Sequence, residues 1–374
     1  MSGENCLAGL KILDLTQFEA GPSCTEALAW LGADVVKIEN PGSGDPGRSL
    51  GRTSPDADAL YFLQYNSNKR SAAINLKDPR GLELVKRLIK CADVMIENFA
   101  PGAIERLGLG YEAIKAVNPA IIYCQVKGFG TGMVMAISIL AAYVRCLRTG
   151  QGEHLVVGMQ DSVIHYIRNA FAYMDRSDGK AAPRIGSRTV GGGQPPIGVY
   201  PCKGGGPNDY VYIYAGAASP EHWNRLLKAM GREDLIGDTR YSTAAARLER
   251  RAEVDEIVAN WTCQLDKHTV MRLVGATAPA GAVLDTREIA DDPTFEQRKI
   301  RQTMAHPVIG NYTMSGWPVR FGDAPPAVGP APLLGQHSGN VLADWLKMDD
   351  VAIGTLRDAK VIAGDVAATA IAAE

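Results

Sequence analysis

The chain has 374 residues, 46% of them hydrophobic and 21% charged, which suits a globular protein with a substantial buried core. A chain of this length more often forms two domains than one. The formal net charge is −2 with both signs interspersed, so we expect no basic surface that binds nucleic acid. The N-terminus has no signal-peptide pattern, and the longest apolar run, 133–144, is too short to cross a bilayer. We therefore expect a cytoplasmic protein without a membrane span.

In the first half of the chain, short apolar strands alternate with helical patterns. Strands are predicted at 10–15, 34–38, 93–96, 120–126 and 155–157. One helix runs through 28–31 and is broken by Gly32, a second opens at Asp78-Pro79, and a third begins at Asp161. Strands separated by helices predict an α/β fold with a parallel sheet covered on both faces.

The second half predicts a smaller α+β segment. Glycine and proline become frequent between 183 and 207, which indicates a linker. A strand is predicted at 210–214, and Ser219-Pro220 is a typical helix start. Further helices are expected at 244–263, 268–274, 340–346 and 351–359, with short strands after Pro307.

The cysteines and histidines do not indicate a metal centre. The seven cysteines occur singly, without a CxxC pair, and the six histidines show no ligand spacing such as HxxxH. We expect buried, reduced thiols and no bound metal.

Short strings spread along the chain point to a known family. They are 19–22 (EAGP), 31–39 (LGADVVKIE), 68–71 (NKRS), 97–102 (ENFAPG), 127–129 (KGF), 149–152 (TGQG), 159–161 (MQD), 191–194 (GGGQ) and 332–337 (PLLGQH). In this order the chain resembles the family III CoA-transferases, and in particular the formyl-CoA:oxalate CoA-transferase branch.

The resemblance implies a Rossmann-like large domain built from both chain ends, at 1–190 and 307–374. A linker with a glycine loop at 191–209 would join it to a small α+β domain at 210–306. The resemblance also implies an interlocked homodimer. The implied activity is transfer of CoA from an acyl-CoA thioester to a small carboxylic acid, through an aspartyl acyl intermediate.

The chain departs from the family after Gly130, where an internal deletion is indicated. Residues 127–130 (KGFG) are followed directly by 131–133 (TGM). In the family, several tens of residues lie between these strings and end in a Gly-Asp pair whose Asp is the nucleophile. This chain has no counterpart, so the catalytic residue is unknown and we predict an inactive or impaired enzyme. Glu19 and Asp161 are the candidate substitutes, although Asp161 is also interpretable as a helix cap.

The resemblance also implies a site for coenzyme A. It assigns CoA contacts to Glu19, Ala20, Asn40, Ile74, Asn75, Leu76, Lys77, Asn98, Phe99, Ala100 and Arg106. Asn40 stands where the oxalate branch has Arg, and Glu19 stands where it has Gln near the acyl group. An ionised Glu19 would repel a dicarboxylate.

The glycine loop has two interpretations. Gly192, Gly193 and Gln194 are predicted to face the substrate, because glycines let backbone N–H groups approach an acyl oxygen. The alternative is a plain linker next to Pro195-Pro196.

Other functions remain open at this stage. The chain could be a non-catalytic CoA-binding or dimer-partner subunit, or it could be related to the acyl-CoA racemases. Gly128-x-Gly130-x-Gly132 follows a strand and precedes a helix, like a dinucleotide-binding turn, but its spacing is not GxGxxG.

Overall fold

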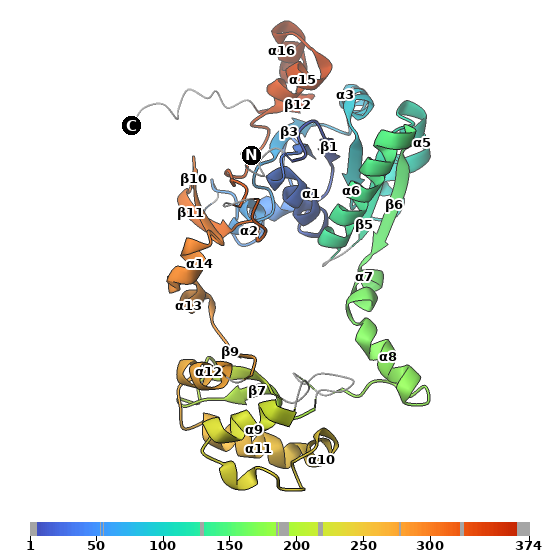
Figure 1. Cartoon of the computed structure of the whole chain (residues 1–374). Helices are drawn as coiled ribbons and strands as arrows, with labels where there is room; N and C mark the ends of the chain where they lie inside the picture. Colours follow the sequence, from blue (N-terminus) through green and yellow to red (C-terminus); the bar gives the residue numbers. More distant parts are fainter. Residues whose placement is uncertain are drawn as a thin grey trace. The chain divides into compact units, whose positions relative to one another are not determined.

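The structure is a computed structural model, and it describes residues 6–52, 54, 56–127, 131–184, 186, 194–215, 220–276, 278–321 and 325–364. The chain forms two compact units (Figure 1). The large unit comprises residues 1–165 and 294–374, and the small unit comprises 166–293. Both ends of the chain therefore build the large unit, which encloses the small unit in the sequence.

The large unit is organised around a seven-stranded sheet in the order β12-β3-β2-β1-β4-β5-β6. Strands β1 to β6 are parallel, and the short β12 joins β3 antiparallel. Their bounds are β1 Lys11–Asp14, β2 Asp34–Glu39, β3 Arg70–Ile74, β4 Val94–Glu97, β5 Ile122–Lys127, β6 Glu153–Gly158 and β12 Ile362–Ala363. The parallel sheet and the five strands predicted in the first half are confirmed.

Helices cover both faces of this sheet, as the alternation of strands and helices predicts. One hydrophobic core lies under α3, α4, α5, α15 and α16, and the other lies under α1 and α6. Leu13 points into the first core and Ile12 into the second, because successive strand residues face opposite sides. The bounds are α1 Ala20–Trp30, α3 Pro79–Cys91, α4 Ala103–Arg106, α5 Tyr111–Val117, α6 Gly132–Thr149, α15 Ser338–Leu346 and α16 Asp350–Asp358.

Helix α6 starts directly against α1. A Cβ atom at Gly132 would lie 2.3 Å from the Ser23 hydroxyl oxygen and 3.1 Å from the Ala20 carbonyl, so this approach requires glycine. Thr131, just before the helix, is fully buried. The chain that follows the junction is therefore packed beside the N-terminus of α1.

The outer face of α6 is apolar and exposed. Met133, Ile137, Val144 and Leu147 are 46%, 66%, 46% and 70% exposed. Among the described helices, α6 is the one whose length and composition would suffice to cross a membrane, and 22% of it is buried. A core helix of a water-soluble protein passes the same test, so this is weak evidence for a span.

The small unit is built on a three-stranded antiparallel sheet in the order β7-β8-β9, packed against helices through a core that includes Trp223, Leu226, Val258 and Val270. Its elements are α8 Arg168–Arg176, β7 Ile197–Pro201, β8 Tyr210–Tyr214, α9 Pro220–Ala229, η3 Glu233–Leu235, α10 Ala244–Glu249, α11 Arg251–Thr262, α12 Lys267–Gly275, β9 Ala280–Ala282 and α13 Thr286–Asp291. The helix predicted at 244–263 is two helices, because the backbone leaves helical geometry at Arg250.

The division between the units differs from the predicted domain bounds at 190/191 and 306/307. The hairpin of β10 (Arg301–His306) and β11 (Gly310–Ser315) belongs to the large unit. Its side chains Met304 and Met314 share a core with Trp30 and Phe62 of that unit. The remaining elements are η2 Pro46–Ser49, α2 Leu60–Leu63, α7 Met159–Tyr166 and α14 Pro293–Gln297.

Candidate functional site

The strand order places a topological switch point between β1 and β4. Strand β1 pairs with β2 on one side and β4 on the other, so the chain reverses its direction across the sheet at β1. In open α/β sheets, ligands bind beyond the carboxyl ends of the strands at such a reversal. The segments that follow β1 and β4 are therefore the candidate functional site.

These two segments are joined by one side chain. The Asn98 side chain accepts from the Gln17 backbone N–H (2.8 Å) and donates to the Gln17 carbonyl (2.7 Å). Beneath it, the buried Glu97 carboxylate accepts from the Phe99 N–H (2.7 Å) and from the Gln125 side-chain amide (2.8 Å). Each polar group here has a defined partner, which gives the edge a fixed shape.

The loop between β1 and α1 is held in a strained conformation. Phe18 has φ of 64°, a region that bulky residues rarely adopt, and its side chain is 46% exposed. Its N–H donates to the buried Asp45 carboxylate (3.2 Å). Strain of this kind persists only where the surroundings enforce it, and it is concentrated at functional sites.

Glu19 lies next to this strained residue, at the N-cap of α1. One of its carboxylate oxygens, Oε2, is buried without a hydrogen-bond partner among the described residues. Burial raises the pKa of Glu19 above its ordinary value. Ala20, the first residue of α1, is buried beside it. The site therefore carries a carboxyl group that is more readily protonated than usual.

Two tyrosines that sequence reasoning missed lie near Glu19. Tyr61 and Tyr65, one helical turn apart at α2, pack edge to face with ring centroids 5.2 Å apart. Burial raises the pKa of Tyr65, and the Glu19 carboxylate adds to this effect. Their i, i+4 spacing was visible in the sequence, but nothing there connected them to Glu19.

A buried network of charged side chains fixes the backbone at the end of β1, next to the candidate site. The Lys69 ammonium contacts the Asp14 carboxylate (3.1 Å), and that of Lys37 contacts Asp45 (2.8 Å) and donates to the Thr16 carbonyl (2.7 Å). Burial would raise the pKa of Asp14, but Lys69, Lys37 and neighbouring hydroxyl groups lower it well below its usual range. The end of β1 is thereby fixed by fully buried ion pairs.

Glu26, buried in the same region, gives the fold a predicted pH dependence. Burial raises its pKa to about 8 from 4.5. The folded chain therefore keeps this proton between about pH 4.5 and 8, where the unfolded chain loses it, so stability falls as pH rises through this range. We expect the Glu26→Gln variant to lack this dependence. As pH rises, its free energy of unfolding should therefore increase relative to that of the wild type, by at most ~1.4 kcal/mol per pH unit. Denaturant unfolding at pH 5, 7 and 9 would measure it, and a constant difference would contradict the assignment.

Two family strings meet at the far side of this network. The Arg48 guanidinium forms a bidentate pair with Glu39 (2.8 and 2.7 Å) and donates to the Pro332 carbonyl. Ser71 donates to Glu39 (2.7 Å) and accepts from the Gly335 N–H (2.8 Å). The strings at 68–71 and 332–337 are therefore structural partners of β2.

The segment assigned to the nucleotide of CoA follows β3. Ile74 is buried at the strand end, Leu76 is half-buried on the core, and the Lys77 side chain is exposed. The Asn75 N–H donates to the Val361 carbonyl (2.9 Å), and its side chain accepts from the Lys77 N–H (3.1 Å). This turn presents the exposed Lys77 ammonium, which has no ion pair with a described residue, at the same edge of the sheet as Asn98.

Other assigned residues lie around the same edge. Phe99 is half-buried against the core and Ala100 is exposed. The exposed Arg106, at the end of α4, extends over Gly102, whose Cβ would lie 3.1 Å from its guanidinium. Asn40 follows β2, but its side chain accepts from the Gly42 and Ser43 N–H groups (2.8 and 3.3 Å), so it stabilises a turn.

The second candidate carboxylate is distant from this group. Asp161 lies in the first turn of α7 and is exposed, after β6. Strand β6 is three positions from β1 in the sheet, or about 14 Å. The structure therefore places Glu19, and not Asp161, at the carboxyl ends of β1 and β4. We call this place, formed by the segments that follow the two strands, the β1–β4 edge.

The predicted substrate loop is only partly covered. Gly191, Gly192 and Gly193 lie outside the described residues, while Gln194 is half-buried in the small unit. No group of three or more potential metal ligands occurs among the described residues. All seven cysteines are free, with Cys24, Cys124 and Cys202 buried and Cys6 and Cys263 exposed.

The fold defines an α/β protein whose sheet reverses its strand order between β1 and β4. The sequence model of CoA-transferase family III matches residues 7–132 and 130–338. The chain belongs to this family.

Its relatives are consistent with this assignment. The chain is 34% identical to the formyl-CoA:oxalate CoA-transferase of Streptomyces coelicolor, over 95% of this chain and 99% of that protein. It is 35% identical to the protein of the same name from Escherichia coli O157:H7, over 92% and 96%. Among solved structures, a CaiB/BaiF family protein from Brucella suis superposes with a TM-score of 0.76 at 27% identity, covering 90% of this chain and 98% of that one.

Proposed function

We propose that this chain binds CoA, as an acyl-CoA, at the β1–β4 edge, and that its CoA-transferase activity is absent or greatly reduced. The observation that carries the proposal is the direct passage from β5 to α6: residues 128–132 contain no carboxylate. Two comparisons support a deletion there. The family match is divided into two segments that meet at 130–132, and the alignment to the Streptomyces protein spans 411 residues, more than this chain possesses.

The expected loss follows from the chemistry. CoA exchange through a covalent intermediate needs a carboxylate that attacks the thioester and returns the acyl group. Glu19 is a poor substitute, because burial keeps its carboxyl protonated to a higher pH than usual and a protonated carboxyl is a weak nucleophile. The alternative activity, a racemase-like proton transfer, would need an acidic side chain from the same absent segment.

The side chains near the acyl position would influence which small acid the site accepts. Glu19 carries negative charge when ionised and offers a proton when neutral, and Tyr61 and Tyr65 add hydroxyl groups nearby. We propose a small carboxylic acid as the acceptor that the intact site once took, and formyl-CoA-like thioesters as donors. The free thiols are consistent with a cytoplasmic location.

Calorimetric titration with CoA and an exchange assay test the proposal together. We expect CoA to bind, and formyl-CoA/oxalate exchange to stay at least 10³-fold below that of the Streptomyces coelicolor relative assayed beside it. Absence of CoA binding, or exchange at the rate of the relative, would each refute the proposal.

Asn98 provides a sharper test of the position of the site. Asn98→Ala removes both hydrogen bonds to Gln17, so the loop that carries Glu19 and Ala20 loses its fixed position. We expect CoA binding to weaken about tenfold or more. Asn260→Ala, at an exposed asparagine of α11, is the matched control and should bind as the wild type does. Equal affinities for both variants would move the site elsewhere.

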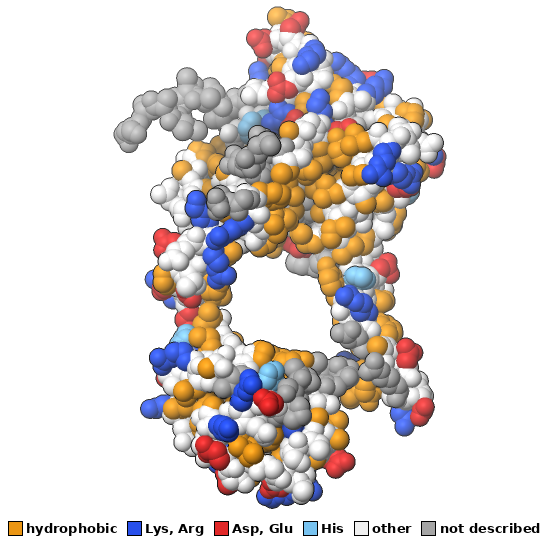
Figure 2. Space-filling model, viewed as in Figure 1, with side chains coloured by type: hydrophobic (Ala, Val, Ile, Leu, Met, Phe, Trp, Pro, Cys, Tyr) orange, Lys and Arg blue, Asp and Glu red, His pale blue; other side chains and the backbone are white. Residues whose placement is uncertain are grey.

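A homodimer is the proposed assembly. The exposed apolar residues of α6 recur at intervals of four, seven and three, which places them on one helical face, and Figure 2 shows hydrophobic side chains gathered where Figure 1 places this helix. Monomeric proteins rarely leave such a face uncovered. We expect a mass of about twice 40.0 kDa in light scattering.

Charges on α6 should disrupt this assembly. For Ile137→Glu/Leu147→Glu we expect a monomer, while Val351→Glu, at a single exposed valine of α16, should remain dimeric. A wild-type monomer, or an unchanged dimer in the double variant, would rule out this surface as the interface.

A further inference from the structure

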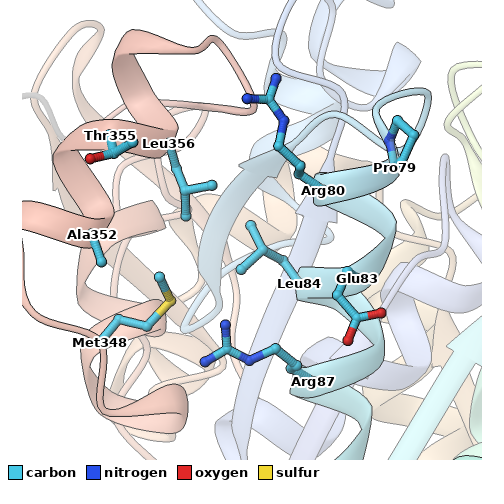
Figure 3. A pocket seen from close by; sticks show the side chains of 9 residues that line it. All are labelled: Pro79, Arg80, Glu83, Leu84, Arg87, Met348, Ala352, Thr355 and Leu356. Carbon is cyan, nitrogen blue, oxygen red and sulfur yellow. The ribbon is translucent and has the colours of Figure 1, made fainter.

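A groove separates helices α3 and α16 on the outer side of the large unit. Helix α15 packs against both, and between them lies a cavity of about 530 Å³ (Figure 3). Its walls are apolar: Leu84 from α3 faces Met348, Ala352 and Leu356 from the α16 side. Leu84 is only 3% exposed, so the floor of the groove is continuous with the hydrophobic core. The volume lies in the range of small-molecule sites.

Two arginines stand at opposite ends of this apolar floor. Arg80 and Arg87 are seven residues apart on α3, which corresponds to about 10 Å along the helix. Arg80 is engaged by the Asp78 carboxylate (3.0 and 2.7 Å). Arg87 forms no hydrogen bond or ion pair with any described residue, and its side chain extends towards Met348.

The direction of the Arg87 side chain differs from what its spacing from Glu83 on α3 would favour. Glu83 precedes Arg87 by four residues, the arrangement in which a helical ion pair usually forms. In Figure 3 the Glu83 carboxylate points away from α16 while Arg87 points across the groove, and no ion pair joins them within 4.0 Å. The Arg87 guanidinium, which has no ion pair or hydrogen bond within the described part of the chain, thus lies beside an apolar cavity.

We propose that this groove binds an amphipathic organic anion, specifically a medium-chain alkyl carboxylate. Its carboxylate would pair with Arg87, and its alkyl chain would lie over Leu84, Met348 and Leu356 towards Arg80. The charge of the free arginine selects an anionic head, and the apolar walls select a hydrocarbon body.

This site is separate from the proposed CoA site. It lies between α3 and α16, whereas the CoA contacts lie at the strand ends. The two adjoin at the turn Asn75–Asp78, where Asp78 caps α3 and holds Arg80. The inference therefore does not depend on the proposed function.

Titration of the full chain with decanoate, below its micellar concentration, tests the proposal. We expect saturable binding, and binding at least about tenfold weaker for decyltrimethylammonium, which has the same tail and a cationic head. Arg87→Glu should weaken decanoate binding about tenfold, whereas Lys90→Glu, an exposed charge on the same helix outside the groove, should change it less than about twofold. Ala352→Trp should fill the groove and abolish binding.

Three binding results, besides that of the tryptophan variant given below, would overturn the proposal. They are the absence of saturable decanoate binding, equal binding of the anionic and cationic amphiphiles, and an equal effect of Arg87→Glu and Lys90→Glu. Unchanged binding in Ala352→Trp would show that the ligand occupies another place. The Arg87 variant keeps the test valid if the tryptophan variant fails to fold, because Arg87 is only half-buried.

Discussion

Restoring the segment between Gly130 and Thr131 should raise CoA exchange by at least about 10³-fold. The insert would be whatever segment the Streptomyces coelicolor relative carries at this place. The family resemblance implies that this segment ends in a Gly-Asp pair. The remaining edge of the site is already ordered: Asn98 holds Gln17, and Glu97 holds Phe99. Removing a nucleophile from a covalent enzyme costs several orders of magnitude, so returning one should recover a similar factor. The rate of formyl-CoA/oxalate exchange measures it.

The matched control carries the same insert with its Gly-Asp aspartate changed to alanine. It should fold as the restored chain does and remain as slow as the natural chain. Equal activity of the two inserts would mean that rescue comes from packing and not from the nucleophile. No gain from either insert would mean that the rest of the site has diverged too far to support catalysis.

Lys69→Met should produce the largest loss of stability among single substitutions in the buried network, about 3–5 kcal/mol. The Lys69 ammonium contacts Asp14 (3.1 Å), the Pro22 carbonyl (3.0 Å) and Asn66 (2.9 Å), all away from solvent. Without it, the Asp14 carboxylate keeps Lys37, the Thr16 N–H and the hydroxyl groups of Thr16 and Thr25 as partners. Denaturant unfolding monitored by tryptophan fluorescence gives the difference in free energy.

Arg80→Met is the control for this prediction. It breaks a pair of similar geometry with Asp78, but on the surface, where water replaces the lost partner. We expect its unfolding midpoint to stay close to that of the wild type. A Lys69→Met variant as stable as Arg80→Met would show that Asp14 is not held as a buried anion.

The fold was predictable where local pattern determines it. Strand β8 was predicted at its observed bounds, and Asp78 caps α3 as the sequence indicates, because its side chain accepts from the Arg80 N–H. The division between the units was less accessible. It depends on which core the hairpin β10–β11 joins, and Met304 shares a core with Trp30, a residue far from it in the sequence.

The site was predictable only as a set of residues without geometry. Asn98 was assigned through the family resemblance, but its double hydrogen bond to Gln17 depends on β1 and β4 being neighbours in the sheet. Lys37 lies within a predicted strand, yet nothing local indicates that a lysine there is fully buried against Asp45. Tyr61 was missed for the same reason, since its proximity to Glu19 arises from the tertiary structure.

Covalent trapping is the most direct measurement of the central claim. The purified chain would be incubated with formyl-CoA and oxalate, quenched with hydroxylamine, and analysed by mass spectrometry of the intact protein and its peptides. We predict an unmodified chain, because residues 128–132 supply no carboxylate where the resemblance implies the family nucleophile. A hydroxamate on an acidic side chain, whether at Glu19, Asp161 or elsewhere, would contradict that prediction and identify the group that has taken over the reaction.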